Sequence, residues 1–143
     1  MISRLCIIIL CLRSVLSARP MTFKGSISRG IVDTHLHVWS DGAPPFPYSD
    51  GQDPPEALRD SQPEQLMGEM AAAGVDGALI VQPINHKFDH AFVTSIISDP
   101  RYQGKFKGMA LLDPTADNDY LPSLKAQGYV GVRFNPYLFN DDL

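Results

Sequence analysis

The sequence predicts an α/β domain built around a parallel sheet, and two kinds of observation support this. Short apolar runs alternate with segments of helical spacing, in the order strand, loop, helix, strand, helix, strand, helix, strand. The runs are almost continuously apolar, which is typical of parallel strands buried on both faces. Glycines and prolines stand where these segments begin or end. This alternation favours parallel strands joined by helical crossovers.

The four expected strands are the apolar runs at 31–38, 77–81, 108–112 and 130–134. Between the first and second runs lies a long segment from Trp39 to about Asp60. It contains a cluster of prolines, and we expect it to form a loop without regular structure.

The first expected helix is the most clearly marked element. Ser61, Gln62, Pro63 and Glu64 form the pattern of a capping box with proline in the first turn. Gly74 supplies the left-handed residue that ends such a helix. Two further helices are expected, at 89–97 and at 119–127.

Composition narrows the class of protein. A chain of 143 residues with 44% hydrophobic residues suits one domain with a real core. The net charge of −4 and the lack of a basic stripe argue against a nucleic-acid partner. The two cysteines, Cys6 and Cys11, both lie in the first dozen residues, which excludes a disulfide framework in the rest of the chain.

Residues 1–29 are expected to form a leader separate from the domain at 30–143. The leader is basic and acid-free, and its apolar run at 5–12 is too short for a bilayer, which needs about 20 residues. A plastid or mitochondrial transit peptide fits this composition best. One alternative is a secretory signal. The other is that the segment before Met21 resembles an untranslated leader, and that Met21 is the start of a cytoplasmic protein. We expect no membrane contact in the mature form.

Three polar side chains share one face of the first expected strand. Asp33, His35 and His37 alternate with residues of the other face. The two imidazoles lie about 7 Å apart along the strand and can converge on one metal ion. The Asp33 carboxylate could orient an imidazole through its other ring nitrogen. The alternative is a histidine pair that serves packing or the surface alone.

The strand at 31–39, IVDTHLHVW, is similar to the opening strand of the amidohydrolase-related family. The similarity is to the branch with aminocarboxymuconate-semialdehyde decarboxylase and pyrone-dicarboxylate lactonase. Segments 78–83, 106–114 and 128–135 resemble the second, third and fourth strands of that branch, in the same order. The resemblance extends over about 30–140.

The resemblance implies a (β/α)8 barrel of the TIM type, with the site at the carboxyl ends of the strands. It implies metal-assisted hydrolysis of a lactone, amide or similar carbonyl substrate, or decarboxylation of a small molecule. The metal in this family is usually zinc. His35 and His37 would be ligands, with Asp33 supporting them.

Several other polar residues are candidates for the site. Arg133 and Asn135 share a face near the end of the fourth strand; the arginine could grip a substrate carboxylate or pair with a nearby aspartate. Gln82 could face the substrate, although such a glutamine more often satisfies loop backbone. His86 and His90 are spaced for one helix face, and we expect them to be solvated or capping residues.

The family's other ligands are histidines after the fifth and sixth strands and an aspartate at the eighth, which also acts as the base. We therefore expect 30–143 to be the N-terminal half of a barrel, with four β/α units, truncated after the fourth strand and inactive alone. Its open sheet edges would favour self-association. The alternative function is a non-catalytic half-barrel that acts by protein association.

Overall fold

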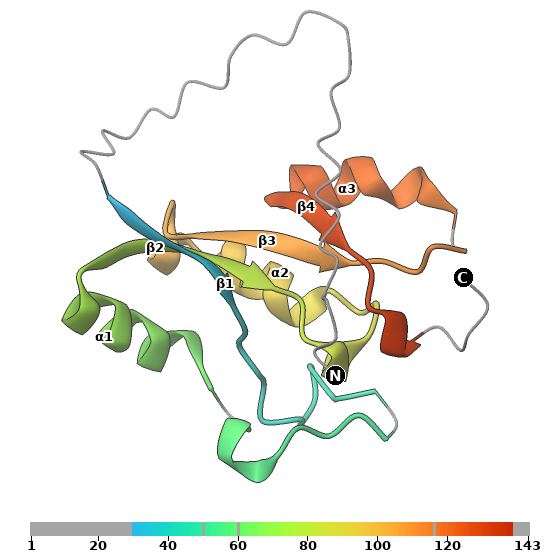
Figure 1. Ribbon diagram of the computed structural model, residues 1–143, viewed down its shortest axis with the longest axis horizontal. Helices are drawn as coiled ribbons and strands as arrows, with labels where there is room; N and C mark the ends of the chain where they lie inside the picture. The colour runs from blue at the N-terminus through green and yellow to red at the C-terminus, as the bar shows by residue number, and fades with distance from the viewer. Residues whose placement is uncertain (1–29, 50, 60, 116, 139–143) are drawn as a thin grey trace, which may run out of the picture.

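A computed structural model describes residues 30–49, 51–59, 61–115 and 117–138. The predictions for the leader and for the last residues fall outside these ranges. The described part contains a four-stranded parallel sheet in the order β1-β2-β3-β4 (Figure 1). The strands are β1 (Ile31–Leu36), β2 (Val75–Val81), β3 (Phe106–Leu111) and β4 (Tyr129–Arg133). The predicted α/β class with a parallel sheet is therefore confirmed.

Three α-helices connect the strands: α1 (Pro63–Ala73), α2 (Ala91–Ile97) and α3 (Leu121–Ala126). Each helix contacts the strand that follows it in the sequence. Single 3-10 turns lie at Glu56–Leu58, Ile84–His86, Pro100–Tyr102, Asn118–Tyr120 and Pro136–Leu138. Within the described ranges no helix is long and apolar enough to cross a bilayer.

The main core lies between the sheet and its helices. Ile80 of β2, Ala110 of β3 and Val93 of α2 are fully buried in one apolar cluster. Val81 and Leu111 follow Ile80 and Ala110 directly, so their side chains point to the opposite face of the sheet. Both are also buried, but neither belongs to the helix-side cluster.

The ends of several elements differ from the predictions, most clearly at the start of α1 and the end of β1. The prediction of a capping box at the start of α1 is wrong. The N-cap residue is Gln62, which makes no side-chain capping bond, and the Ser61 hydroxyl donates to the carbonyl of Leu58. The stop at Gly74 is confirmed, with φ at 68°. Strand β1 ends at Leu36, earlier than predicted, and its pairing with β2 is irregular between positions 33 and 36.

The loop after β1 is more ordered than its prolines suggested, and it includes the 3-10 turn Glu56–Leu58. The Trp39 indole donates to the Asn85 side chain at 2.8 Å, and the Ser49 amide donates to the Asn85 carbonyl at 2.9 Å. Asn85 lies in the connection between β2 and α2. The loop is therefore attached to the end of the neighbouring strand.

The packing of β3 against β4 requires a glycine at position 108. A Cβ atom added at Gly108 would lie 2.5 Å from Cδ1 of Tyr129. Tyr129 is buried, and its hydroxyl contacts Thr94 of α2 at 3.2 Å. The aromatic ring thus occupies the space above Gly108 and joins β4 to the helix layer.

A pair of glycine substitutions tests this contact. We expect Gly108→Ala to lower the free energy of unfolding by about 1–3 kcal/mol, because the methyl group overlaps a buried ring. Gly68→Ala is the matched control: it lies inside α1 with no atom near the added methyl group, so it should raise stability by about 1 kcal/mol. Urea titration followed by circular dichroism measures both changes. An unchanged Gly108→Ala midpoint would contradict the close contact.

Candidate functional site

The candidate metal ligands meet at the carboxyl end of β1. His35 is in the strand and His37 follows its last residue. Their ring centroids are 5.3 Å apart and the planes are nearly perpendicular, at 87°. His35 is exposed, whereas His37 is half-buried and also contacts Trp39. The strand phase predicted from sequence does bring the two imidazoles together.

The ring of His37 is held by main chain. Its Nδ1 lies 2.7 Å from the carbonyl oxygen of Val81, the last residue of β2. A carbonyl can only accept, so Nδ1 carries the proton and Nε2 keeps a free lone pair when the ring is neutral. This is the arrangement in which a histidine binds a metal through Nε2 while its other nitrogen is fixed.

The pKa of His37 also favours metal binding, because it keeps the ring neutral. Burial is the main cause that lowers its pKa below 6.5, and the positive charges of Arg133 and His35 lower it further, against the opposing hydrogen bond to Val81. The ring is therefore neutral at neutral pH. Arg133, the last residue of β4, pairs with Leu111 of β3, whose side chain points away from the helix-side core, so Arg133 lies on the sheet face away from the helices.

Arg133 carries an unsatisfied donor. Its side chain is half-buried, burial lowers its pKa, and its buried Nε has no hydrogen-bond acceptor among the described residues. The predicted alternative, pairing with a nearby aspartate, is absent from the ion pairs of the described part. A buried guanidinium nitrogen without an acceptor is a group that a bound carboxylate would satisfy.

Asp33 supports its neighbour in a different way from the one predicted. Its carboxylate accepts the backbone N–H of His35 at 2.9 Å and does not bond a ring nitrogen in the structure. The ring-orienting role expected of Asp33 is taken, for His37, by the Val81 carbonyl. Asp33 thus helps to hold the backbone of β1 where its pairing with β2 is irregular.

Gln82 and Asn135 both bond local backbone. Gln82 is fully buried, and its amide nitrogen donates to the carbonyl of Asp89 at 2.6 Å. It shares the phase of Ile80, which faces the helices, and it supports the loop as the alternative to substrate binding expected; its role in substrate binding stays a prediction. Asn135 accepts the N–H of Tyr137 at 3.0 Å and starts the turn after β4; its role in substrate binding stays a prediction.

The other two described histidines both bond backbone. His90 is the N-cap residue of α2, as predicted for a capping residue, but its side chain makes no capping bond; the prediction of a solvated residue is wrong for His86. His86 is buried, with Nδ1 3.1 Å from the carbonyl of Pro47. His90 is half-buried, with Nε2 3.1 Å from the carbonyl of Leu111. Burial is the largest cause lowering the pKa of each, so both remain neutral donors to backbone.

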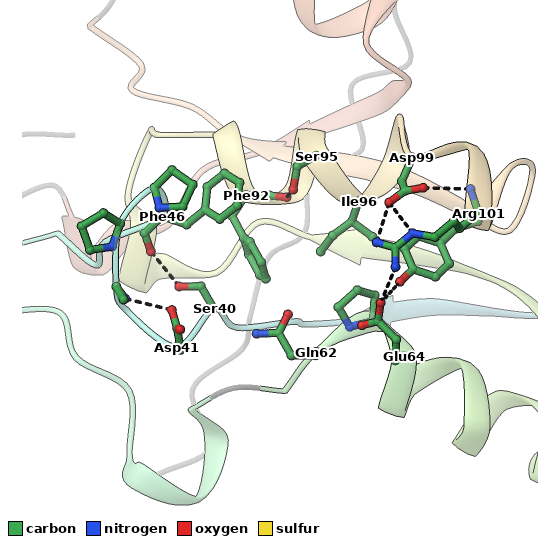
Figure 2. A pocket seen from close by; sticks show the side chains of 15 residues that line it. Ser40, Asp41, Phe46, Gln62, Glu64, Phe92, Ser95, Ile96, Asp99 and Arg101 are labelled. Atoms are coloured by element: carbon green, nitrogen blue, oxygen red, sulfur yellow. Dashed lines mark hydrogen bonds and ion pairs between the residues drawn. The ribbon is translucent and has the colours of Figure 1, made fainter.

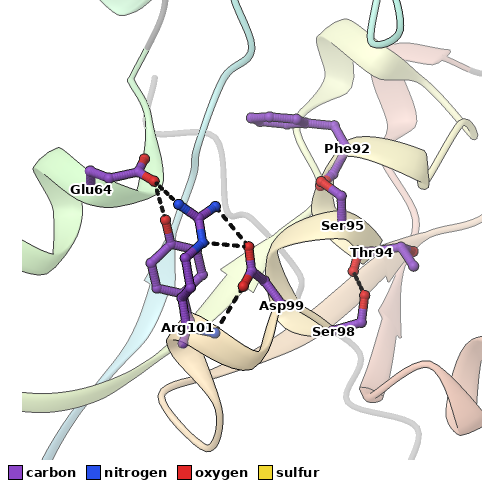
Figure 3. Close-up of polar contacts among 8 residues, drawn as sticks. Glu64, Phe92, Thr94, Ser95, Ser98, Asp99 and Arg101 are labelled. Carbon is purple, nitrogen blue, oxygen red and sulfur yellow. Dashed lines mark hydrogen bonds and ion pairs between the residues drawn. The ribbon is translucent and has the colours of Figure 1, made fainter.

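A cavity of about 400 Å³ lies away from the histidine pair, between the loop after β1 and the ends of α1 and α2. Figure 2 shows Phe46 and Phe92 at one end of this cavity and Glu64 and Arg101 at the other. The Arg101 guanidinium bridges Glu64 at 3.0 Å and Asp99 at 2.7 Å (Figure 3). The charged side chains at this end of the cavity, Glu64, Asp99 and Arg101, are thus paired with one another.

A smaller cavity of about 180 Å³ does include His37. It lies between the end of β1 and the first turns of α1. The residues that line it are His37, Val38, Trp39, Ser61, Gln62, Gln65, Leu66 and Glu69.

The residues present fit part of a zinc site. A catalytic zinc ion takes three protein ligands and a water, with imidazole nitrogens as common donors. His35 and His37 supply two such donors, one of them with a fixed tautomer. The described residues contain no cluster of three or more histidine, cysteine, aspartate or glutamate side chains that could hold a metal ion.

No family model matches the chain. Two curated proteins are similar: 4-sulfomuconolactone hydrolase of Rhizobium radiobacter, 32% identical over 82% of this chain, and D-galactarolactone isomerase of Agrobacterium fabrum, 30% identical over 73%. The chain spans 38% and 34% of their lengths.

A crystal structure with citric acid bound is also similar to this chain. It is described as a "probable 2-pyrone-4,6-dicarboxylic acid hydrolase" from Acinetobacter baumannii, and it matches with a TM-score of 0.65 and 25% identity. The match covers 78% of this chain and 39% of that one, as expected for half of a TIM-type barrel. The chain is therefore a homologue, over part of their length, of the lactone hydrolases and isomerases of the amidohydrolase-related family.

Proposed function

We propose that this chain provides two zinc ligands and a carboxylate-binding arginine of an enzyme that hydrolyses lactones. The hydrogen bond from His37 to the Val81 carbonyl is the observation that carries the proposal, because it leaves Nε2 free for a metal. Lactone chemistry is supported by the names of the relatives, a lactone hydrolase and a lactone isomerase. Decarboxylation of a similar substrate is the weaker alternative.

Each residue has a defined task in this proposal. His35 and His37 bind the metal through ring nitrogens, and Val81 keeps the His37 ring in position. Arg133 binds a carboxylate of the substrate, which satisfies its buried Nε. Zinc, when bound, polarises a carbonyl group and lowers the pKa of a water molecule. Two protein ligands are fewer than a catalytic zinc site needs, so we expect no turnover from the chain by itself.

Zinc binding tests the ligand pair. We expect His37→Ala to weaken zinc binding by more than about tenfold, because the ligand with the fixed tautomer is lost. Thr34→Ala is the matched control, since it removes an exposed side chain from the other face of β1. Competition with a chelating indicator measures both. Equal zinc affinity in the two variants would contradict the assignment.

The pKa of His37 gives a second test. Its pKa lies below 6.5, so the ring stays neutral and able to bind zinc above that pH. As the pH falls through the folded-state pKa, protons compete for Nε2 and zinc affinity should decrease. Calorimetric titrations at several pH values measure this change. Affinity that is flat down to strongly acidic pH would show that His37 is not a ligand.

Citrate is a suitable probe of Arg133, because a related hydrolase was solved with citric acid bound. We expect citrate to perturb the NMR signals of residues around the end of β4, and Arg133→Gln to remove most of this effect by removing the charged donor. Lys125→Gln, on the exposed surface of α3, is the control and should leave the perturbation unchanged. Equal perturbation in Arg133→Gln would contradict carboxylate binding there.

A further inference from the structure

Three aromatic rings form a row at the carboxyl end of β1. The ring centroids of His35 and His37 are 5.3 Å apart, and those of His37 and Trp39 are 5.5 Å apart, with planes inclined at 53°. Side chains two positions apart in an extended segment share a face, and these contacts continue the row past the end of the strand. Trp39 is therefore the next side chain after the two proposed metal ligands.

The ring of His37 is contacted from two sides. Its Nδ1 lies 2.7 Å from the carbonyl oxygen of Val81. A hydrogen bond to a carbonyl oxygen tolerates a broad range of angles, so this bond alone leaves the imidazole free to tilt. The contact with the Trp39 ring restricts that tilt. The two contacts together set the direction of the lone pair on Nε2.

The position of the Trp39 indole depends on Asn85. The main chain at Trp39 is fixed by its neighbours, because Val38 and Ser40 are both buried. The Trp39 side chain is only half-buried, and its Nε1 donates to Oδ1 of Asn85 at 2.8 Å. Without this acceptor, the indole would keep its backbone position but lose the bond that fixes its ring.

The contacts of Asn85 allow only one orientation of its amide. Nδ2 donates to the carbonyl of Gln52 at 2.5 Å, and a carbonyl can only accept. Oδ1 therefore faces the indole N–H, which can only donate. The main-chain carbonyl of Asn85 also accepts the amide of Ser49 at 2.9 Å. Three bonds thus hold Asn85 between the loop after β1 and the connection from β2 to α2.

The turn that carries Asn85 has an unfavourable backbone conformation. It is followed by Lys87, whose φ is 45°. A positive φ is costly for a residue other than glycine, and it persists where surrounding contacts determine it. The bonds of Asn85, and the bond from His86 Nδ1 to the carbonyl of Pro47 at 3.1 Å, are such contacts.

We propose that Asn85 is a positioning residue of the metal site: it holds the Trp39 indole, which in turn fixes the ring of His37. This inference rests on the proposed function, because it takes His37 as a metal ligand. Asn85 touches neither metal nor substrate in this assignment, so its effect passes through Trp39. Removing a residue that orients a metal ligand commonly weakens metal binding by about tenfold or more.

Zinc affinity of the 143-residue protein, measured by competition with a chelating indicator, is the first test. Asn85→Ala should weaken zinc binding by about tenfold, because the indole loses its acceptor. Trp39→Phe should weaken it by a similar factor, because phenylalanine keeps a ring but has no N–H to hold it. Gln103→Ala is the matched control: this exposed amide lies before β3, at the other end of the sheet, and its loss should leave zinc affinity unchanged.

The double variant tests the route of the effect. If Asn85 acts through the indole, Asn85→Ala combined with Trp39→Phe should bind zinc as weakly as either single variant, since the same bond is already lost. If the two factors multiply instead, Asn85 acts by another route and the inference is overturned.

A spectroscopic signature separates positioning from general support of the loop. The chain has one tryptophan, so its indole N–H gives a single NMR peak. Asn85→Ala should move this peak toward that of an indole in water. Zinc should shift the peak in the wild-type protein but not in His37→Ala. An indole peak that Asn85→Ala leaves in place would contradict the bond from Trp39 to Asn85.

The outcomes separate this inference from the proposed function. If His37→Ala weakens zinc binding but folded Asn85→Ala and Trp39→Phe bind zinc as the wild type does, the positioning role is overturned and the ligand assignment stands. If zinc affinity does not depend on His37, both are overturned. Circular dichroism checks folding, and Trp39→Phe, the milder substitution, decides the outcome if Asn85→Ala does not fold.

Discussion

The common direction of the four strands is the constraint on which the candidate site depends. Because the strands are parallel, their carboxyl ends meet at one edge of the sheet. His37 follows β1, Val81 ends β2 and Arg133 ends β4, so residues far apart in the sequence come to the same edge of the sheet. The hydrogen bond that fixes His37 exists only because β1 and β2 end side by side.

Much of this arrangement could be predicted from the sequence because its causes are local. Alternation of side chains along a strand places His35 and His37 on one face, and the structure shows their rings in contact. Gly74 ends α1 because it takes up the left-handed conformation that other residues avoid. Apolar runs bounded by Gly and Pro correctly indicated all four strands.

The errors have causes that residue types do not reveal. The Val81 carbonyl holds the His37 ring, but a backbone acceptor looks the same at every position of a sequence. Gln82 keeps the phase of Ile80 and bonds loop backbone, which was the favoured alternative, because a strand end alone does not tell which face a side chain takes. Asp33 bonds the backbone of His35 where the pairing of β1 with β2 is irregular, and that irregularity depends on the neighbouring strand.

The bond from His37 to Val81 also has an evolutionary consequence. A carboxylate that orients a histidine can be lost by a single codon change, whereas a main-chain carbonyl is kept whatever side chain follows it. Position 81 can therefore vary among apolar residues while the tautomer of His37 is preserved. The tautomer of this imidazole can change only if the two strands shift relative to each other, which would disturb the whole sheet.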